Sequence, residues 1–193
     1  MFKKVLVAED LDSISISIVK VLEELAILEI HHAKYCDDAF LKIKKGLHNS
    51  TPYDLLISDL SFKPDHRESR FSSGEELIEA AKKLQPDLKT IIFSIEDKSF
   101  RIKSLFTNLE INAYVSKGRN SIPELKKTIQ RIYNNKEEKL STELSLALRD
   151  NSLFEIESYD IALLKSLSKG FTLENISSEF KESGIVPNGS SSL

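Results

Sequence analysis

The sequence has little cysteine, methionine or tryptophan and no long apolar run. Its 193 residues include one cysteine, Cys36, one methionine and no tryptophan. A single cysteine excludes an intrachain disulfide, so we expect a packing thiol and a reducing compartment. No apolar run reaches the roughly 18 residues of a membrane span, and Glu9 and Asp10 interrupt the short apolar run near the N-terminus. We therefore expect a cytoplasmic protein with neither a membrane segment nor a signal peptide.

An excess of charge of either sign is also missing. The chain has 27 Lys and Arg residues against 30 Asp and Glu residues, a formal net charge of −3. This balance gives no whole-chain electrostatic argument for binding nucleic acid or a membrane, so any such contact would need a local patch. With 40% apolar and 30% charged residues, the composition is ordinary for a globular protein, and the length allows one full domain and a smaller one.

Short β-branched runs alternate with longer helix-like stretches from residue 4 to about residue 136. This alternation is typical of an α/β fold, and here it predicts a doubly wound, five-stranded parallel sheet covered by helices. The expected strands are 4–8, 27–33, 55–58, 90–94 and 113–116. The expected helices are roughly 12–25, 37–47, 74–84, 97–108 and 120–135.

The first of these helices has an ambiguous pattern. Serine and isoleucine alternate at period two over residues 13–18, as they would in a strand. We interpret the segment as a helix because apolar residues continue at helical spacing through Val21, Leu22 and Leu25. Asp12 is suited to cap its start.

Four of the expected strands end in polar or charged residues. Glu9 and Asp10 follow the first strand, Asp59 follows the third, Ser94 closes the fourth and Lys117 follows the fifth. In a doubly wound parallel sheet, ligands bind in the crevice outside the carboxyl ends of the strands. We therefore expect these five side chains to share one crevice.

Three carboxylates in one crevice would repel each other unless a cation compensates them, and an all-oxygen ligand set favours Mg²⁺. A carboxylate beside a divalent ion and a lysine can attack phosphorus, which would make an aspartyl phosphate. Each residue alone has a simpler interpretation. Asp10 or Asp12 would cap a helix, Ser94 would be a polar strand end, and Lys117 would be a solvated lysine.

The motifs that carry these residues resemble the receiver (CheY-like) domain of bacterial two-component response regulators, which has a flavodoxin-like fold. They are Val5–Asp10, Asp54–Leu60, Gly74–Ile78, Ser94 and Ala113–Lys117. The resemblance covers about 130 residues, in order, and we assign residues 1–136 to this domain. It implies that Asp59 accepts a phosphoryl group from a sensor histidine kinase or a phosphotransfer protein.

The resemblance also implies a role for each neighbour of Asp59. Asp10, Asp59 and the main-chain carbonyl of Ser61 would ligate Mg²⁺ directly, and Glu9 would act largely through water. Ser94 would be the switch hydroxyl that bonds the phosphoryl oxygen, Tyr114 the aromatic switch, and Lys117 the lysine that pairs with the phosphate. Phosphorylation would then bias a two-state equilibrium.

The sequence departs from the family's pattern in three places. Asp59 and Gly74 lie fifteen residues apart, which is longer than usual, and the extra segment 63–71 is mostly polar. That loop would recognise a partner or shield the phosphoryl group, or it is a solvated insertion without function. Ile95 stands where the family usually has a small residue, and Gly118 where it often has proline.

A change of pattern after residue 136 predicts a linker over 137–156 and a small all-α segment over 157–193. Two short helices with a glycine-containing turn are expected from Ser158, as in a helix-turn-helix unit. Residues 170–180 resemble the start of a LuxR-type DNA-binding domain. The chain stops at Leu193, where a recognition helix would only begin, so we expect a truncated output domain, with a naturally short protein as the alternative.

Three functions compete. The leading one is a response regulator that is phosphorylated at Asp59, forms a homodimer and switches transcription through DNA; it would not be an enzyme. The second is a receiver that relays phosphate or binds a protein without DNA, and residues 139–193 support it because five basic against eight acidic residues should bind phosphate backbones poorly. The third is an Mg²⁺-dependent phosphohydrolase, which usually needs an aspartate where Ser61 stands.

Overall fold

Residues 1–63, 69–134 and 158–183 are described by a computed structural model. The chain divides into two units, Met1–Leu148 and Arg149–Leu193, and we describe each by itself. The predicted linker 137–156 and the end of the predicted output segment, 184–193, lie outside the described residues. Within the described ranges, no helix combines the length and apolar character needed to cross a membrane.

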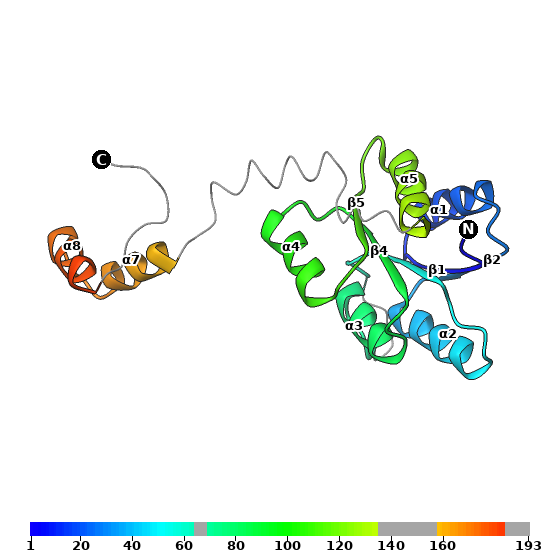
Figure 1. Cartoon of the computed structure of the whole chain (residues 1–193), viewed down its shortest axis with the longest axis horizontal. Helices are drawn as coiled ribbons and strands as arrows, with labels where there is room; N and C mark the ends of the chain where they lie inside the picture. The colour runs from blue at the N-terminus through cyan, green and yellow to red at the C-terminus, as the bar shows by residue number, and fades with distance from the viewer. Residues whose placement is uncertain (64–68, 135–157, 184–193) are drawn as a thin grey trace. The chain divides into compact units, whose positions relative to one another are not determined.

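Five parallel strands form the sheet of the first unit (Figure 1). They are β1 (Lys4–Ala8), β2 (Glu29–Ala33), β3 (Leu55–Ser58), β4 (Lys89–Ser94) and β5 (Ala113–Ser116). Their order across the sheet is β2-β1-β3-β4-β5, which confirms the predicted doubly wound topology. The prediction began β2 two residues too early, because the Ile27 N–H donates to the Leu22 carbonyl in the turn that closes the preceding helix, and not to a neighbouring strand.

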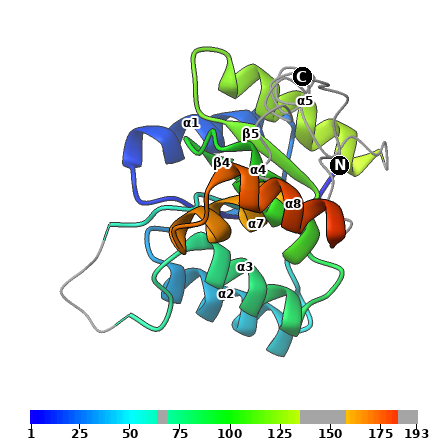
Figure 2. The same ribbon diagram turned by 90° about the vertical axis from the view of Figure 1, so that its left-hand side faces the viewer.

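Helices cover both faces of this sheet (Figures 1 and 2). On one face lie α1 (Asp12–Glu24) and α5 (Ser121–Tyr133). On the other lie α2 (Cys36–His48), α3 (Gly74–Leu84) and α4 (Ser99–Asn108). All five predicted helices are therefore confirmed to within about two residues at each end.

The apolar side chains of the strands pack into two separate cores, one on each face of the sheet. In β1, Val5 and Val7 pack in the cluster under α1 and α5, whereas Leu6 and Ala8 pack in the cluster under α2, α3 and α4. Successive side chains of a strand point to opposite faces, so a strand buried on both faces must be apolar throughout. Cys36 lies in the second of these clusters, where burial raises the pKa of its thiol to about 12. This supports the interpretation of Cys36 as a packing thiol.

The ambiguous serine–isoleucine segment is helical, as predicted. The residue at its N-cap position, however, is not the predicted one. Leu11 occupies the N-cap position of α1, and no side chain caps it. Asp12 is instead the first helical residue, and its carboxylate lies 2.7 Å from Lys34 Nζ. The prediction that Asp12 caps α1 is therefore wrong, because the carboxylate turns toward a lysine at the end of β2.

Over the described residues 158–183, the second unit contains two helices, α7 (Ser158–Ser168) and α8 (Leu173–Glu182), as the sequence predicts. Gly170 between them has φ of +82°, a left-handed conformation that glycine adopts without strain. Ile176 and Phe180 of α8 are buried.

Two isoleucines in the alternating segment of α1 test its helical register. Ile18 is 1% exposed and Ile16 is 68% exposed, although a strand would place both on one face. We expect Ile18→Ala to lower the free energy of unfolding by about 2–5 kcal/mol. Ile16→Ala should change it by less than about 0.5 kcal/mol. Urea unfolding of both variants measures this, and equal effects would contradict the register.

Candidate functional site

The strand order places the ends of β1 and β3 side by side. Glu9 and Asp10 follow β1, Asp59 follows β3, and the Asp59 N–H bonds the Ala8 carbonyl at 3.0 Å. Each of the three acidic residues offers a carboxylate oxygen, and these oxygens lie within 4.8 Å of one another. The acidic cluster expected from the strand ends is therefore present. It lies at the topological switch point, between the ends of β1 and β3, where the strand order of the sheet reverses.

Lys117 joins this cluster from the end of β5. Its Nζ lies 2.6 Å from Asp59 Oδ2 and 2.8 Å from Glu9 Oε2, and its side chain is only 9% exposed. The Lys117 N–H also donates to the Ser94 carbonyl at 2.8 Å, which fixes the backbone beside β4. Lys117 therefore reaches the cluster although glycine, and not proline, follows it at position 118.

The electrostatics of the cluster favour a cation. Burial raises the pKa of the Glu9 carboxyl, and the negative charge of Asp59 adds to this effect. The ion pair with Lys117 and the Leu11 N–H act in the opposite direction. A divalent ion among the three carboxylates would favour their ionised forms further, since opposite charge stabilises the charged state. The all-oxygen donor set fits Mg²⁺.

Asp10 and Ser61 tie the loop after β3 to the cluster. The Lys63 N–H donates to Asp10 Oδ2 at 3.0 Å. Ser61 forms an isolated antiparallel bridge with Ser73, at the base of the long loop. The bridge holds the two ends of the long loop side by side, so the extra residues do not separate β3 from α3. The metal-ligand role of the Ser61 carbonyl stays a prediction.

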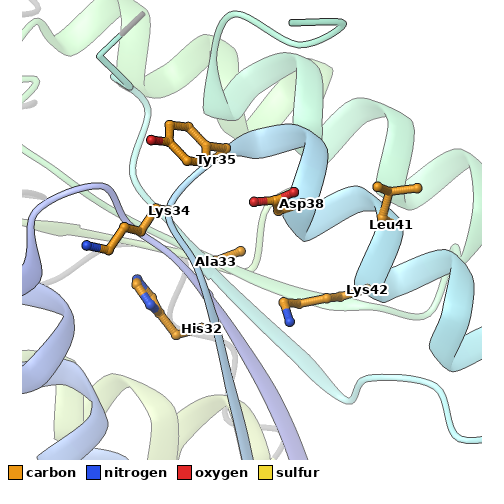
Figure 3. Close-up of a pocket in the computed structure, with 7 residues that line it drawn as sticks. All are labelled: His32, Ala33, Lys34, Tyr35, Asp38, Leu41 and Lys42. Atoms are coloured by element: carbon orange, nitrogen blue, oxygen red, sulfur yellow. The ribbon is translucent and has the colours of Figure 1, made fainter. Parts of the chain in front are cut away.

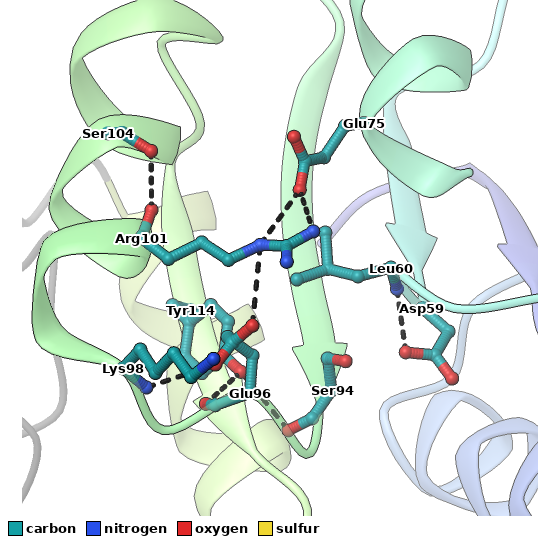
Figure 4. Close-up of polar contacts among 9 residues, drawn as sticks. All are labelled: Asp59, Leu60, Glu75, Ser94, Glu96, Lys98, Arg101, Ser104 and Tyr114. Carbon is teal, nitrogen blue, oxygen red and sulfur yellow. Dashed lines mark hydrogen bonds and ion pairs between the residues drawn. The ribbon is translucent and has the colours of Figure 1, made fainter.

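The start of α3 packs directly against the backbone of Asp59. Gly74 donates its N–H to the Leu60 carbonyl at 2.9 Å, and a Cβ at Gly74 would lie 1.8 Å from the Asp59 carbonyl oxygen. Only glycine allows this approach. The Asp59 side chain is buried, and its Oδ1 accepts the Leu60 N–H at 2.6 Å (Figure 4). The fifteen-residue spacing therefore does not displace Asp59 from α3.

Ser94 and Tyr114 lie beside one another and are both buried. The Tyr114 hydroxyl donates to the carbonyls of Glu96, at 2.6 Å, and Ser94, at 3.3 Å (Figure 4). Burial raises the pKa of this phenol, so it remains a protonated donor. Ile95 is 73% exposed and turns its side chain outward. Sequence reasoning did not identify Glu96, because no motif or strand-end pattern marks it.

A separate pocket of about 460 Å³ lies beside the end of β2 and the start of α2 (Figure 3). Its lining residues are His32, Ala33, Lys34, Tyr35, Asp38, Leu41 and Lys42. None of the clustered carboxylates lines it, although His32 Nε2 lies 2.9 Å from the Glu9 carbonyl oxygen. The acidic cluster, where Lys117 lies against buried carboxylates, is therefore the better candidate site.

The strand order and the acidic cluster at the strand ends are those of a receiver-like fold. Solved structures with this fold are similar to the chain. The RcsB response regulator of Salmonella typhimurium, in a structure on its conformational dynamism for DNA interaction, is 19% identical with a TM-score of 0.68; the match covers 93% of this chain and 83% of that one. The isolated REC domain of RcsB from Salmonella enterica serovar Typhimurium, with phosphomimetic BeF₃⁻, is 20% identical with a TM-score of 0.59, covering 75% and 97%.

A CheY-like receiver domain of Methanospirillum hungatei JF-1 is 25% identical with a TM-score of 0.57, covering 71% of this chain and 98% of that one. A LuxR-family response regulator also matches. No protein-family model matches the chain, and no curated protein matches it by sequence. The structural neighbours of this chain are thus response regulators and receiver domains, which confirms the fold that the sequence resemblance implied.

The close approach at Gly74 can be tested by adding one methyl group. Gly74→Ala should destabilise the protein by about 1–3 kcal/mol or more, because the Asp59 backbone or α3 must move. Gly118→Ala, in open space, is the matched control and should change stability by less than about 0.5 kcal/mol. Chemical unfolding of both variants measures the difference. A Gly74→Ala protein as stable as the control would contradict this packing.

Proposed function

We propose that the first unit is a phosphorylatable switch and that Asp59 accepts the phosphoryl group from a phosphohistidine protein. The contact of Lys117 Nζ with both Asp59 and Glu9, inside a cluster of three carboxylates, carries this proposal. Receiver-like structural neighbours, one of them solved with a phosphomimetic, add support.

In the reaction, a carboxylate oxygen of Asp59 forms a bond to phosphorus while the bond from phosphorus to the donor nitrogen breaks. Lys117 lies within hydrogen-bond distance of Asp59 and would pair with the transferred group. Asp10, Asp59 and the Ser61 carbonyl would hold Mg²⁺, with Glu9 acting through water. The metal supplies positive charge for the phosphoryl oxygens. Because the chain modifies only itself, it is a switch and not an enzyme with turnover.

Ser94 and Tyr114 would convert phosphorylation into a change of shape. The Ser94 hydroxyl would donate to a phosphoryl oxygen on Asp59, and the β4–α4 segment would shift with it. Tyr114 now holds that segment through the carbonyls of Ser94 and Glu96. The added group would therefore favour one of two arrangements of the same segment.

The second unit would carry the output of the switch. Its two helices and glycine turn suit the first part of a helix-turn-helix domain, and the RcsB match covers 93% of this chain. We propose transcriptional regulation through DNA, with a homodimer formed on phosphorylation.

A protein-binding output is the second candidate. Residues 139–193 carry five basic and eight acidic residues, which opposes contact with DNA phosphates. Apolar side chains on α7 and the following turn are exposed, namely Ile161, Leu164, Leu167 and Phe171. A segment of net acidic composition with exposed apolar side chains suits a protein partner better than DNA. The phosphohydrolase hypothesis has no such support, since Ser61 replaces the expected acid.

Intact mass after treatment with Mg²⁺ and a small acyl phosphate tests the phosphoacceptor. We expect one phosphoryl group on the wild-type chain and none on Asp59→Asn. Asp87→Asn, which removes an exposed carboxylate away from the cluster, is the matched control and should still be modified. Chelation of Mg²⁺ should abolish the addition. A wild-type chain that takes up no phosphoryl group would refute the proposal.

Polarisation of a labelled mixed-sequence DNA duplex distinguishes the two outputs. For a DNA output we expect weak binding, with a dissociation constant of about 10⁻⁴–10⁻⁶ M, that strengthens with BeF₃⁻ and Mg²⁺ and weakens with salt. Asp59→Asn should not respond to BeF₃⁻. An unchanged polarisation with the phosphomimetic, in a wild-type chain that does bind it, would favour the protein-binding output.

A further inference from the structure

Arg101, in the first turn of α4, connects three elements around the switch segment (Figure 4). Its Nη2 lies 2.7 Å and its Nε 3.2 Å from Glu75 Oε1, at the start of α3. The same Nε lies 3.3 Å from Glu96 Oε2, in the segment between β4 and α4. One guanidinium thus pairs with a carboxylate on either side of it.

The α3 side of this contact is rigidly placed relative to Asp59. Glu75 directly follows Gly74, whose Cα approaches the Asp59 carbonyl so closely that no side chain would fit. The Glu76 N–H donates to Ser73 Oγ, which caps the same turn. Glu75 is therefore a fixed point next to the backbone that carries Asp59.

The Glu96 side of the contact belongs to the segment that the proposed switch would move. Its Oε1 accepts the Lys98 N–H at 3.1 Å, its Oε2 pairs with Arg101, and its carbonyl accepts the Tyr114 hydroxyl. Glu96 thus links Arg101 to Tyr114, which also bonds the Ser94 carbonyl. A shift of Ser94 toward Asp59 would therefore move this segment relative to Arg101 and disturb the Glu96–Arg101 pair.

We propose that Arg101 is a latch: by pairing with Glu75 and Glu96 together, it holds the β4–α4 segment in the arrangement described here and opposes the shift that phosphorylation requires. The inference rests on the proposed function of Asp59 and concerns the regulation of that site. Arg101 is a positioning residue, since it acts on Ser94 only through Glu96 and Tyr114. Removing it should make the phosphorylated arrangement easier to reach.

The size of the effect follows from solvent exposure. The side chains of Arg101 and Glu75 are 46% and 36% exposed, and that of Glu96 is 16% exposed. Partly exposed ion pairs are weak, so two of them should shift the switch equilibrium roughly two- to five-fold rather than a hundred-fold. The latch would tune the switch without preventing it.

Titration of the full chain with BeF₃⁻ in the presence of Mg²⁺ measures this shift. We expect Arg101→Met, which keeps the aliphatic stem, to bind the phosphomimetic roughly two- to five-fold more tightly than the wild type. Glu75→Gln should act in the same direction, and the double variant should gain nothing beyond Arg101→Met. Lys83→Met is the matched control: it removes the 2.7 Å pair with Glu79 within α3 and should leave the affinity unchanged.

The amide chemical shifts of residues 94–98 distinguish a latch from a general structural role of Arg101, because only loss of a latch would shift them toward the values of the BeF₃⁻-bound protein. In Arg101→Met without phosphomimetic, they should move part of the way toward the BeF₃⁻-bound positions of the wild type. Unchanged or weaker binding by Arg101→Met, with a normal response in the wild type, would overturn the latch alone. No response in the wild type would overturn the phosphoacceptor assignment and the latch with it.

Discussion

The contact on which the first unit depends is the ammonium group of Lys117 between Glu9 and Asp59. Two buried carboxylates, at 2.6 and 2.8 Å from one nitrogen, would repel each other without that positive charge between them. The sheet order makes the contact possible because it brings the ends of β1 and β3 together. Burial raises the pKa of Glu9 even though Lys117 lowers it, so a second cation would stabilise the ionised carboxylate further.

Backbone contacts, rather than side chains alone, hold this arrangement in place. The approach of Gly74 to the Asp59 carbonyl fixes α3, and the bridge between Ser61 and Ser73 closes the long loop beneath it. These contacts explain how an unusually long segment can lie between Asp59 and Gly74 while both keep their positions. Because Ser61 and Ser73 are bridged, residues inserted between them do not change the distance between Asp59 and the start of α3.

Much of this unit could be predicted from the sequence, because apolar runs mark strands and their polar ends meet at one edge. The meeting of Glu9, Asp10, Asp59 and Lys117 follows from that rule alone. Contacts that depend on how elements turn relative to one another could not be predicted. Asp12 turns to Lys34 instead of capping α1, and Arg101 reaches Glu75 from a different helix. In both cases the partner is distant in the sequence and no local pattern marks it.

The Ser94 carbonyl connects the acidic cluster to the rest of the unit. It accepts the Lys117 N–H at 2.8 Å and the Tyr114 hydroxyl at 3.3 Å. Any displacement of Ser94 must therefore change the backbone that carries Lys117 and the bond that holds Tyr114. Because Tyr114 also bonds Glu96, a charge added at Asp59 has a continuous path of contacts to α4. A path of this kind transmits a change only if its contacts have two arrangements. The partly exposed ion pairs of Arg101 are weak enough to be exchanged when the segment moves.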